Sequence, residues 1–308
     1  MADITTNLSG TAELDNSAVL AFNQAFLIAS GQDNVMDDLV QTKVEIGAKS
    51  ISMTKYARLA LATTPANERE EVVSASMTDT EILLTPVEHV AVVTTTPLVN
   101  VQSGGKVDLA AARVVGINAG ATQDKLACLA ADASSNAYII GGTAAGSVIA
   151  SQVASRTFAN YFYNKLARAS VQKINGDYIW VAHDDVIADL RADTAAGGWI
   201  DVNKYQNVGE VISGEVGSFA GFRIVRNNNA TYADQTGAGT VDLYNSYFLG
   251  ANALGKAISQ PVTIGFTKTD KADRFLNVYW KGIFKYGIID QDAIWLGQCA
   301  SSVGNNAA

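Results

Sequence analysis

The stretch that decides the fold is Val107–Asp132, VDLAAARVVGINAGATQDKLACLAAD. It contains no proline, and alanine fills many of the positions between its larger residues. Its large apolar residues recur near helical spacing: Leu109, Val114, Ile117, Leu126 and Leu129. A helix of about 25 residues is about 37 Å long, whereas the average helix has about three turns. The sequence therefore predicts one unusually long helix, over about residues 104–135.

Toward the N-terminus, two extended runs predict a long β-hairpin. Apolar and polar residues alternate from Lys43 to Leu61, and the parity shifts near Gly47, which we interpret as a bulge. A breaker cluster at 63–67, TTPAN, precedes a second extended run over Val72–Leu84. An arm of about 19 residues reaches about 60 Å, further than a compact domain needs. We expect this hairpin to touch another subunit.

The residues before the hairpin predict an arm with one helix. Residues 1–15 are small and polar, and Asn16 is of a type favoured at helix N-caps. Apolar residues then follow at helical spacing: Val19, Leu20, Phe22, Phe26 and Leu27.

On the C-terminal side of the long helix, helices and strands alternate. Gln152–Ala169 predicts a helix and Tyr178–Ala182 a strand, after which Asp184 caps a second helix that runs to Leu190. A strand that feeds a helix after a short turn is typical of a compact αβ lobe. From Pro261 to Leu296 the chain returns to extended structure. Together these patterns predict an α+β protein.

Aromatic residues are frequent in this last quarter: Phe275, Tyr279, Trp280, Phe284, Tyr286 and Trp295. Neighbours along a strand point to opposite faces, so the set cannot form a single platform for a sugar or a base. We expect these rings to pack in a core against the long helix.

The order of elements over essentially the whole chain resembles the major capsid proteins of tailed bacteriophages, the fold named after the Hong Kong phage. A Thr- and Val-rich strand over Pro86–Asn100 fits the same order. Two local stretches carry the resemblance further. Gly214–Val225, GEVGSFAGFRIV, is similar to a glycine-rich turn common in one branch of these proteins, and Lys285–Ile294, KYGIIDQDAI, resembles the close of their last long strand.

The resemblance implies a Hong Kong phage-type fold in four parts. These are an N-terminal arm (1–37), an extended loop (38–85), a peripheral domain with the spine helix (86–149 and 261–308) and an axial αβ domain (150–260). In the family, axial lobes meet at fivefold and sixfold axes, and the extended loop lies over the neighbouring subunit. Since only about 37 residues precede the loop, any scaffolding is expected to be a separate protein.

For function, the resemblance implies a subunit that self-assembles, in the host cytoplasm, into the icosahedral virion shell around double-stranded DNA. Its partners would be other copies in hexamers and pentamers, a portal protein, and in some relatives scaffolding or decoration proteins. Candidate intersubunit contacts lie in the arm and at the loop tip: Leu8, Phe22, Phe26, Thr64, Pro65, Glu68, Arg69 and Glu71. The alternative is an encapsulin-like nanocompartment of the same fold, which would hold a cargo enzyme.

Composition limits the other function classes. A formal net charge of -8 and a pI near 4.8 lack the basic surface of a protein that wraps nucleic acid, so any contact with packaged DNA is expected to be weak and non-specific. Cys128 and Cys299 form no CxxC pair, which argues against a disulfide framework or a zinc site. No segment reaches the ~18 apolar residues of a membrane span, and we expect a soluble chain.

The nearest approach to a catalytic or metal-binding cluster is His183-Asp184-Asp185. It begins a predicted helix directly after a strand, where acidic residues are favoured by capping and by the helix dipole. A G-x-S-x-G nucleophile elbow is absent, which leaves an αβ hydrolase unsupported. The sequence therefore predicts no enzyme, no cofactor and no metal site.

Overall fold

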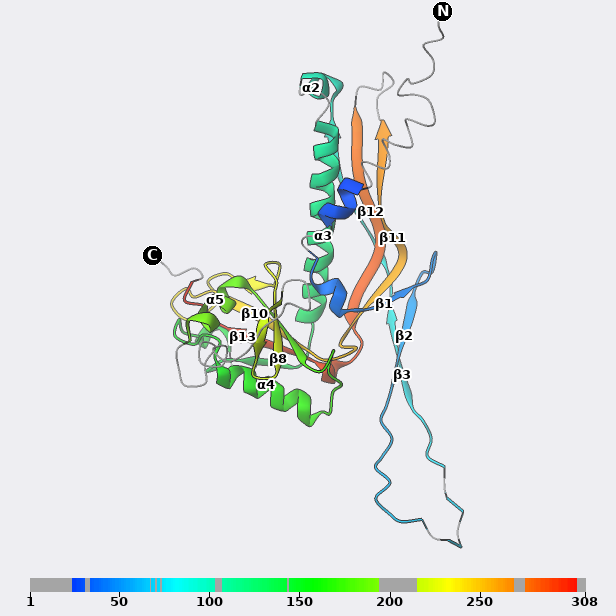
Figure 1. Cartoon of the computed structure of the whole chain (residues 1–308), viewed down its shortest axis with the longest axis vertical. Coiled ribbons are helices and arrows are strands. Elements are labelled where there is room, and N and C mark those ends of the chain that lie inside the picture. The colour runs from blue at the N-terminus through cyan, green and yellow to red at the C-terminus, as the bar shows by residue number, and fades with distance from the viewer. Residues whose placement is uncertain are drawn as a thin grey trace, which may run out of the picture.

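The computed structural model describes residues 24–30, 34–66, 68–69, 71–72, 74–102, 107–142, 144–193, 215–268 and 275–303. They form an elongated lobe built on one long helix and a sheet, a compact αβ lobe beside its lower end, and a hairpin that projects downward from the lower end of the sheet (Figure 1). The mixed α+β architecture predicted from the sequence is confirmed.

The long helix α3 (Val107–Asp132) is the axis of the elongated lobe; the sequence predicts one long helix here over about residues 104–135, and in the structure it ends at Asp132. It buries a face of mainly small residues: Ala111, Ala112, Val115, Gly116, Ala119, Gly120, Gln123, Asp124, Ala127, Cys128 and Ala131. A Cβ at Gly116 would lie 2.7 Å from the Phe26 carbonyl oxygen, so the helical residues 24–30 pack directly on the α3 backbone. The large apolar residues that gave α3 its periodicity, Leu109, Val114, Ile117 and Leu129, are exposed instead.

A four-stranded sheet lies beside α3, in the order β1-β11-β12-β4. Its strands are β1 (Gln41–Val44), β4 (Val87–Thr95), β11 (Leu254–Lys268) and β12 (Leu276–Ile288). β1 pairs parallel with β11, and the other neighbours are antiparallel. Trp280, Phe284 and Tyr286 are buried in the core cluster that includes α3, and Trp280 Nε1 donates to Asn118 Oδ1 of that helix at 2.9 Å. Aromatic packing against the long helix is therefore confirmed for these three residues.

Two sequence-based boundaries change in this lobe. The strand expected over Pro86–Asn100 ends at Thr95, and Pro97 begins a short helix, α2 (Pro97–Gln102). Proline fits the first turn of a helix because its missing N–H would have no partner there. β11 begins at Leu254 and passes through the predicted domain boundary at residue 260.

The αβ lobe is built on a seven-stranded sheet in the described residues, in the order β5-β13-β10-β6-β8-β7 with β9 beside β10. Its elements are β5 (Ala137–Ile139), β6 (Tyr178–Ala182), β7 (Glu215–Phe219), β8 (Phe222–Arg226), β9 (Tyr232–Ala233), β10 (Leu243–Leu249), β13 (Ile294–Cys299), α4 (Arg156–Arg168) and α5 (Asp184–Ala192). The Phe162 ring of α4 stacks on Phe248 of β10 at 3.9 Å between centroids. This contact joins α4 to the sheet in a separate aromatic core.

Local capping explains where the helices of this lobe begin. α4 begins at Arg156 rather than near Gln152, because the Ser155 hydroxyl accepts from Phe158 N. The N-cap of α5 is His183, whose Nδ1 accepts from Asp185 N at 3.3 Å. The prediction that Asp184 caps this helix was wrong by one position.

Strand, turn and strand follow each other over 215–226, within the glycine-rich stretch whose first residue, Gly214, lies outside the described residues. The two turn residues, Ala220 and Gly221, have φ values of 50° and 81°. Two consecutive positive φ values are typical of the tight turn that joins twisted antiparallel strands. The glycine-rich stretch therefore makes a β-hairpin at the edge of the sheet.

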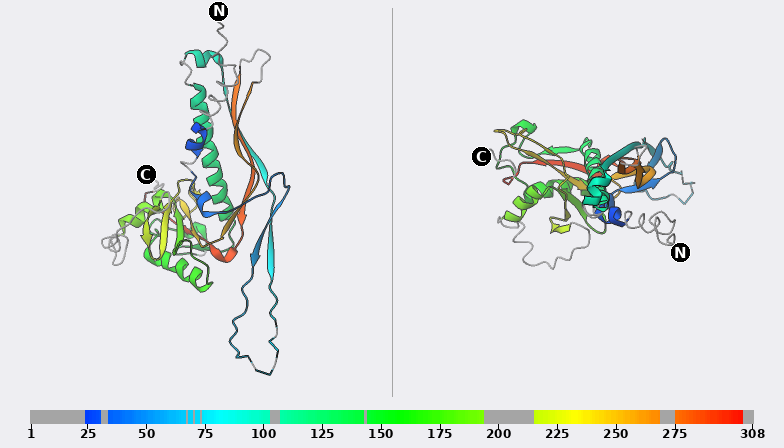
Figure 2. Two further views of the ribbon diagram at one scale, coloured as in Figure 1. Left: turned by 45° about the vertical axis from the view of Figure 1, so that its right-hand side comes forward. Right: turned by 90° about the horizontal axis from the view of Figure 1, so that it is seen from above.

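The projecting hairpin is paired only near its root. β2 (Ile51–Tyr56) pairs with β3 (Asp79–Leu84), and Ala57 N donates to Thr78 O at 2.9 Å, but no ladder joins the described residues beyond that point. The two arms then separate into an open loop (Figure 2). Gly47 lies in a turn with φ 76° between β1 and β2, which pair with different strands. The bulge predicted at Gly47 was therefore wrong, because the chain changes partners there.

Candidate assembly site

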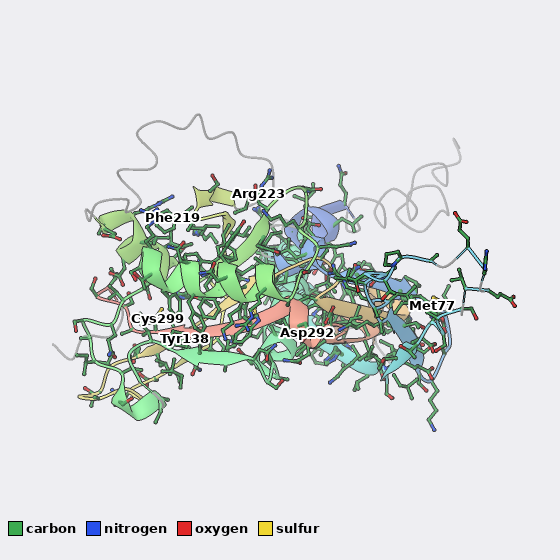
Figure 3. All side chains as sticks on the ribbon, turned by 90° about the horizontal axis from the view of Figure 1, so that it is seen from below. Met77, Tyr138, Phe219, Arg223, Asp292 and Cys299 are labelled. Atoms are coloured by element: carbon green, nitrogen blue, oxygen red, sulfur yellow. The ribbon has the colours of Figure 1, made fainter. Side chains whose placement is uncertain are left out.

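The predicted contacts at the loop tip lie together on the surface. Thr64, Pro65, Glu68, Arg69 and Glu71 are all exposed, at the end of the hairpin furthest from both lobes (Figure 1). In Figure 3, Met77 likewise lies out on the hairpin, away from Tyr138 and Cys299 in the αβ lobe. The tip therefore makes no contribution to the cores of its own chain.

The predicted contacts of the arm are placed differently. Leu8 and Phe22 lie outside the described residues. Phe26 is only 3% exposed and belongs to the core cluster of the elongated lobe. Its ring therefore packs against residues of its own chain.

A small apolar cluster fixes the root of the hairpin to the sheet. Ile51, Met53 and Leu84 of the hairpin are buried against Ala257 and Ile289. The hairpin crosses the sheet where two glycines, Gly255 and Gly287, are direct partners on β11 and β12. Nearby, η3 (Gln291–Ala293) connects β12 to β13.

Polar contacts hold the hairpin residues that follow this root cluster, at Lys55 and Arg58. Lys55 Nζ lies 2.5 Å from Asp290 Oδ1 and 3.5 Å from Asp292 Oδ2. Burial acts to lower the pKa of Lys55, but the hydrogen bond and charge of Asp290, followed by Asp292, outweigh it, and the pKa is raised. The Arg58 guanidinium also donates to the Ser170 carbonyl in the αβ lobe. The direction of the hairpin is thus set by contacts to both lobes.

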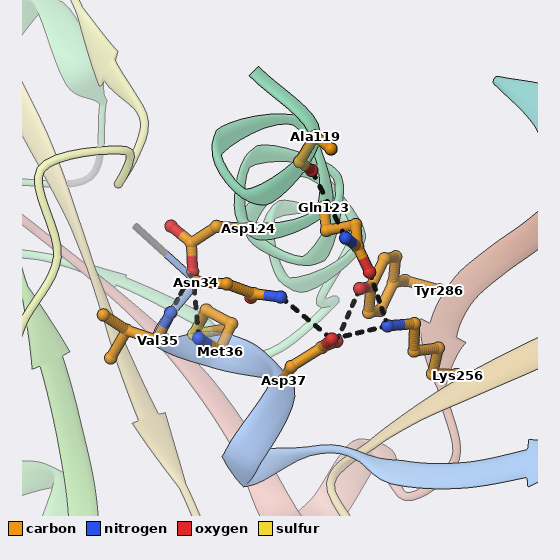
Figure 4. A network of polar contacts seen from close by, with 9 residues as sticks. All are labelled: Asn34, Val35, Met36, Asp37, Ala119, Gln123, Asp124, Lys256 and Tyr286. Atoms are coloured by element: carbon orange, nitrogen blue, oxygen red, sulfur yellow. Dashed lines mark hydrogen bonds and ion pairs between the residues drawn. The ribbon is translucent and has the colours of Figure 1, made fainter. Parts of the chain in front are cut away.

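A second polar network holds residues 34–39, which include η1 (Met36–Leu39) (Figure 4). In η1, the Asp37 carboxylate accepts from Lys256 Nζ at 2.5 Å and from the Tyr286 hydroxyl at 2.6 Å. Lys256 Nζ also donates to Gln123 Oε1 of α3 at 2.9 Å, and this lysine is 5% exposed. Burial, together with the charge of Asp37, raises the pKa of Tyr286. The network connects η1, α3, β11 and β12.

Asp124 of α3 anchors the same segment from the other side. Its carboxylate is fully buried and accepts from Val35 N at 3.1 Å, Met36 N at 2.9 Å and Asn229 Nδ2 at 2.9 Å. Burial raises the pKa of Asp124 even though these hydrogen bonds act in the opposite direction. One side chain therefore joins residues 35–36, α3 and the αβ lobe.

Sequence reasoning did not identify these anchoring residues. The available signal was Lys256, a lone cation within the apolar run ALGKAI at 253–258. A lysine in a buried strand requires a counter-charge. Its partner is separated by 219 positions in the chain, so the pairing depends on the fold.

The described residues contain no other chemical centre. They hold no group of three or more His, Cys, Asp or Glu side chains able to bind a metal. Cys128 and Cys299 are buried and unpaired, and burial raises the pKa of the Cys299 thiol to about 12. His89 packs its ring 5.0 Å from Phe284, and burial lowers its pKa. Among the described helices, none combines the length and apolarity needed to cross a membrane.

Comparison with known proteins identifies the fold. No family model and no curated protein matches the sequence. The capsid of Ralstonia phage GP4 matches with a TM-score of 0.74 over 89% of this chain and 93% of that chain, at 13% sequence identity. The chain has the capsid fold of tailed phages.

Further solved structures share this capsid fold. The capsid of cyanophage P-SCSP1u has a TM-score of 0.62 over 88% of this chain and 89% of that chain, at 13% identity. A virus-like particle from Pyrococcus furiosus has a TM-score of 0.55 over 91% and 98%, at 12% identity. These matches confirm the mixed α+β, capsid-like fold expected from the sequence over most of the chain.

Proposed function

We propose that the protein is the major capsid protein of a tailed bacteriophage, a structural subunit that self-assembles into an icosahedral head around double-stranded DNA. The observation that carries this proposal is the match to the Ralstonia phage GP4 capsid, which extends over nearly all of both chains. The role is architectural, so the protein needs no catalytic residue and no cofactor.

The four predicted parts give the proposed roles. The arm (1–37) and the extended loop (38–85) reach neighbouring subunits, the peripheral domain (86–149 and 261–308) carries the spine helix, and the axial domain (150–260) meets other copies at fivefold and sixfold axes. The start of β11 at Leu254 favours moving the last boundary a few residues earlier.

The extended loop is the strongest candidate for an intersubunit contact. Every described residue from 57 to 78 is exposed, including Leu59, Leu61, Val72 and Met77. A single copy gains no burial from keeping these apolar side chains in water. Contacts repeated by symmetry in a shell would bury them at many equivalent sites.

The proposed partners follow from the same role. Copies of the chain form hexamers and pentamers, and a portal protein, with scaffolding or decoration proteins where used, completes the head. The charge of -8 suits a virion shell that encloses DNA without binding it tightly.

Electron microscopy of the expressed protein tests the proposal directly. We expect uniform icosahedral particles built of the intact chain, and an absence of particles under all assembly conditions would contradict the capsid role. Deletion of Thr63–Glu70 is expected to abolish particles while the subunit keeps its thermal unfolding transition. Normal particles from that variant would contradict the assignment of the loop.

A nanocompartment shell is the second candidate, favoured by the likeness to the Pyrococcus furiosus virus-like particle. The contents of purified particles separate the two functions. Packaged double-stranded DNA supports a phage head, whereas a specific enclosed enzyme supports the nanocompartment.

A further inference from the structure

Strand β4 presents an edge that no described strand covers. It is the last strand of the four-stranded sheet, and its pairing with β12 continues without a bulge from Val87 to Thr95. Its sequence, VEHVAVVTT, contains no proline, lysine or arginine; its one formally charged residue is Glu88, and Val90 and Val92 are exposed. Proteins normally protect such edges with prolines, charges or bulges, because an open edge recruits another strand.

An apolar groove runs beside this edge. It has a volume of about 710 Å³, and its lining includes Leu126 and Leu129 of α3, Val87 and His89 of β4, and Phe284 of β12. Leu129 keeps about half of its surface exposed. A strand added to an edge is held by main-chain hydrogen bonds, and pockets for its alternate side chains select its sequence.

One arm of the hairpin has the matching features. The segment 58–62, RLALA, is extended and exposed, and its one backbone hydrogen bond among the described residues is a local one, from Thr63 N to Leu61 O. Leu59 and Leu61 are two positions apart and therefore point to the same side when the segment is extended. The segment thus combines unpaired main-chain groups with a row of two leucines.

Residues 58–62 of the hairpin cannot reach β4 of their own chain. The hairpin projects downward from its root, whereas β4 rises from the same root along α3 (Figures 1 and 2). The occupant of the edge must come from another copy.

We propose that residues 58–62 of one copy add as a strand to the free edge of β4 in a second copy, with Leu59 and Leu61 seated in the groove beside α3. This inference rests on the proposed shell function and specifies how its loop contact is made. The added strand contains no proline, so each of its residues has a backbone N–H that can donate to β4.

Paired cysteines test the seating of the leucines. The variant Leu61→Cys with Leu129→Cys is assembled and mildly oxidised, and a ladder of covalently linked subunits is expected on a non-reducing gel. The matched control combines Leu61→Cys with Val114→Cys, which is similarly exposed on α3 but does not line the groove. Native Cys128 and Cys299 are buried and should not compete. The proposal is overturned if both cysteine pairs give equal amounts of linked subunits. It is also overturned if particles of the variant Leu61→Cys with Leu129→Cys give no linked subunits.

Hydrogen exchange on the wild-type protein gives a second test that needs no variant. Amide exchange is expected to slow at least about tenfold on assembly over both 58–62 and 87–95. Protection of the loop without protection of β4 would refute the strand pairing while leaving the capsid role intact. Failure of the wild-type chain to form particles would refute the capsid role itself.

Discussion

Gly255 and Gly287 face each other across β11 and β12, and together they make room for the root of the hairpin. A Cβ on Gly255 would collide with Met53 Sδ, and a Cβ on Gly287 would collide with the Leu84 side chain. Both neighbours are buried in the root cluster. The close approach of the hairpin to the sheet therefore depends on the absence of two methyl groups.

Substitution of Gly287→Ala is expected to weaken this contact. The added methyl group overpacks a buried site, which typically costs about 1–3 kcal/mol of unfolding free energy. Urea unfolding of the subunit measures the loss, and particle yield shows its effect on assembly. Gly146→Ala is the control, because its Cβ would meet only the Thr236 carbonyl oxygen at an ordinary 3.7 Å. Equal stability of the two variants would contradict the packing argument.

Removal of the Lys55 side-chain charge is expected to release the hairpin without unfolding the protein. The ion pairs with Asp290 and Asp292 are partly exposed, so Lys55→Met should cost at most about 1 kcal/mol in global stability. Faster amide exchange over 51–56 is the expected local effect, and the exposed Lys49→Met is the control. Equal exchange rates over 51–56 in the two variants would contradict a role of Lys55 in anchoring the loop.

The pH dependence of this contact follows from the raised pKa of Lys55. A cation whose pKa is raised by folding contributes its full stability below the ordinary lysine value of 10.5. That contribution is lost only as the pH rises through the higher folded value. The difference in stability between wild type and Lys55→Met should therefore stay constant from pH 7 to pH 9.

How far the sequence predicts this molecule depends on the range of the interactions. The presence of one long helix at α3 and the limits of β6 follow from local pattern, because proline, glycine and apolar spacing act within a few residues. Which side of α3 is exposed does not follow from local pattern, because the close packing of residues 24–30 on Gly116 turns the small-residue face inward. The large apolar residues that α3 exposes in one copy are available for contacts with another copy in the proposed shell.

The anchoring residues show the same limit. The pairs Lys55–Asp290 and Lys256–Asp37 join segments that are distant in sequence, so no spacing rule reveals them. The turn at Gly47 was missed because β1 pairs with β11, a strand more than 200 residues further along the chain. The loop tip was predictable because a breaker cluster between two extended runs marks it directly.

Neutralisation of Asp124 is expected to change the pH dependence of stability. Burial raises the pKa of this carboxyl above its ordinary value of 3.8, so the folded chain binds the proton more readily than the unfolded chain. Its contribution is fully present below pH 3.8 and is lost as the pH rises through the folded pKa. Asp124→Asn should remove that part of the slope when unfolding is measured between pH 4 and pH 7. The exposed Asp79→Asn gives the background, and identical slopes in both variants would refute the assignment.

The buried pair of Asp37 and Lys256 should show strong energetic coupling. Asp37→Ala leaves the ammonium of Lys256 nearly buried with only Gln123 and the rings of Phe284 and Tyr286 around it, which is expected to cost about 3–5 kcal/mol. Lys256→Met should cost less, because Asp37 is more exposed and keeps its bonds to Tyr286 and Asn34.

The double variant Asp37→Ala with Lys256→Met is therefore expected to be more stable than Asp37→Ala alone, since it removes the unpaired charge. Urea unfolding of the wild type, the two single variants and the double variant measures the coupling energy. If the losses of unfolding free energy in the two single variants simply add up in the double variant, the coupling is contradicted. Because the pair holds η1 against α3, β11 and β12, particles of Asp37→Ala should also lose amide protection at Val35 and Met36. A loss of stability without that local loss of protection would show that the ion pair does not hold residues 35–36 in place.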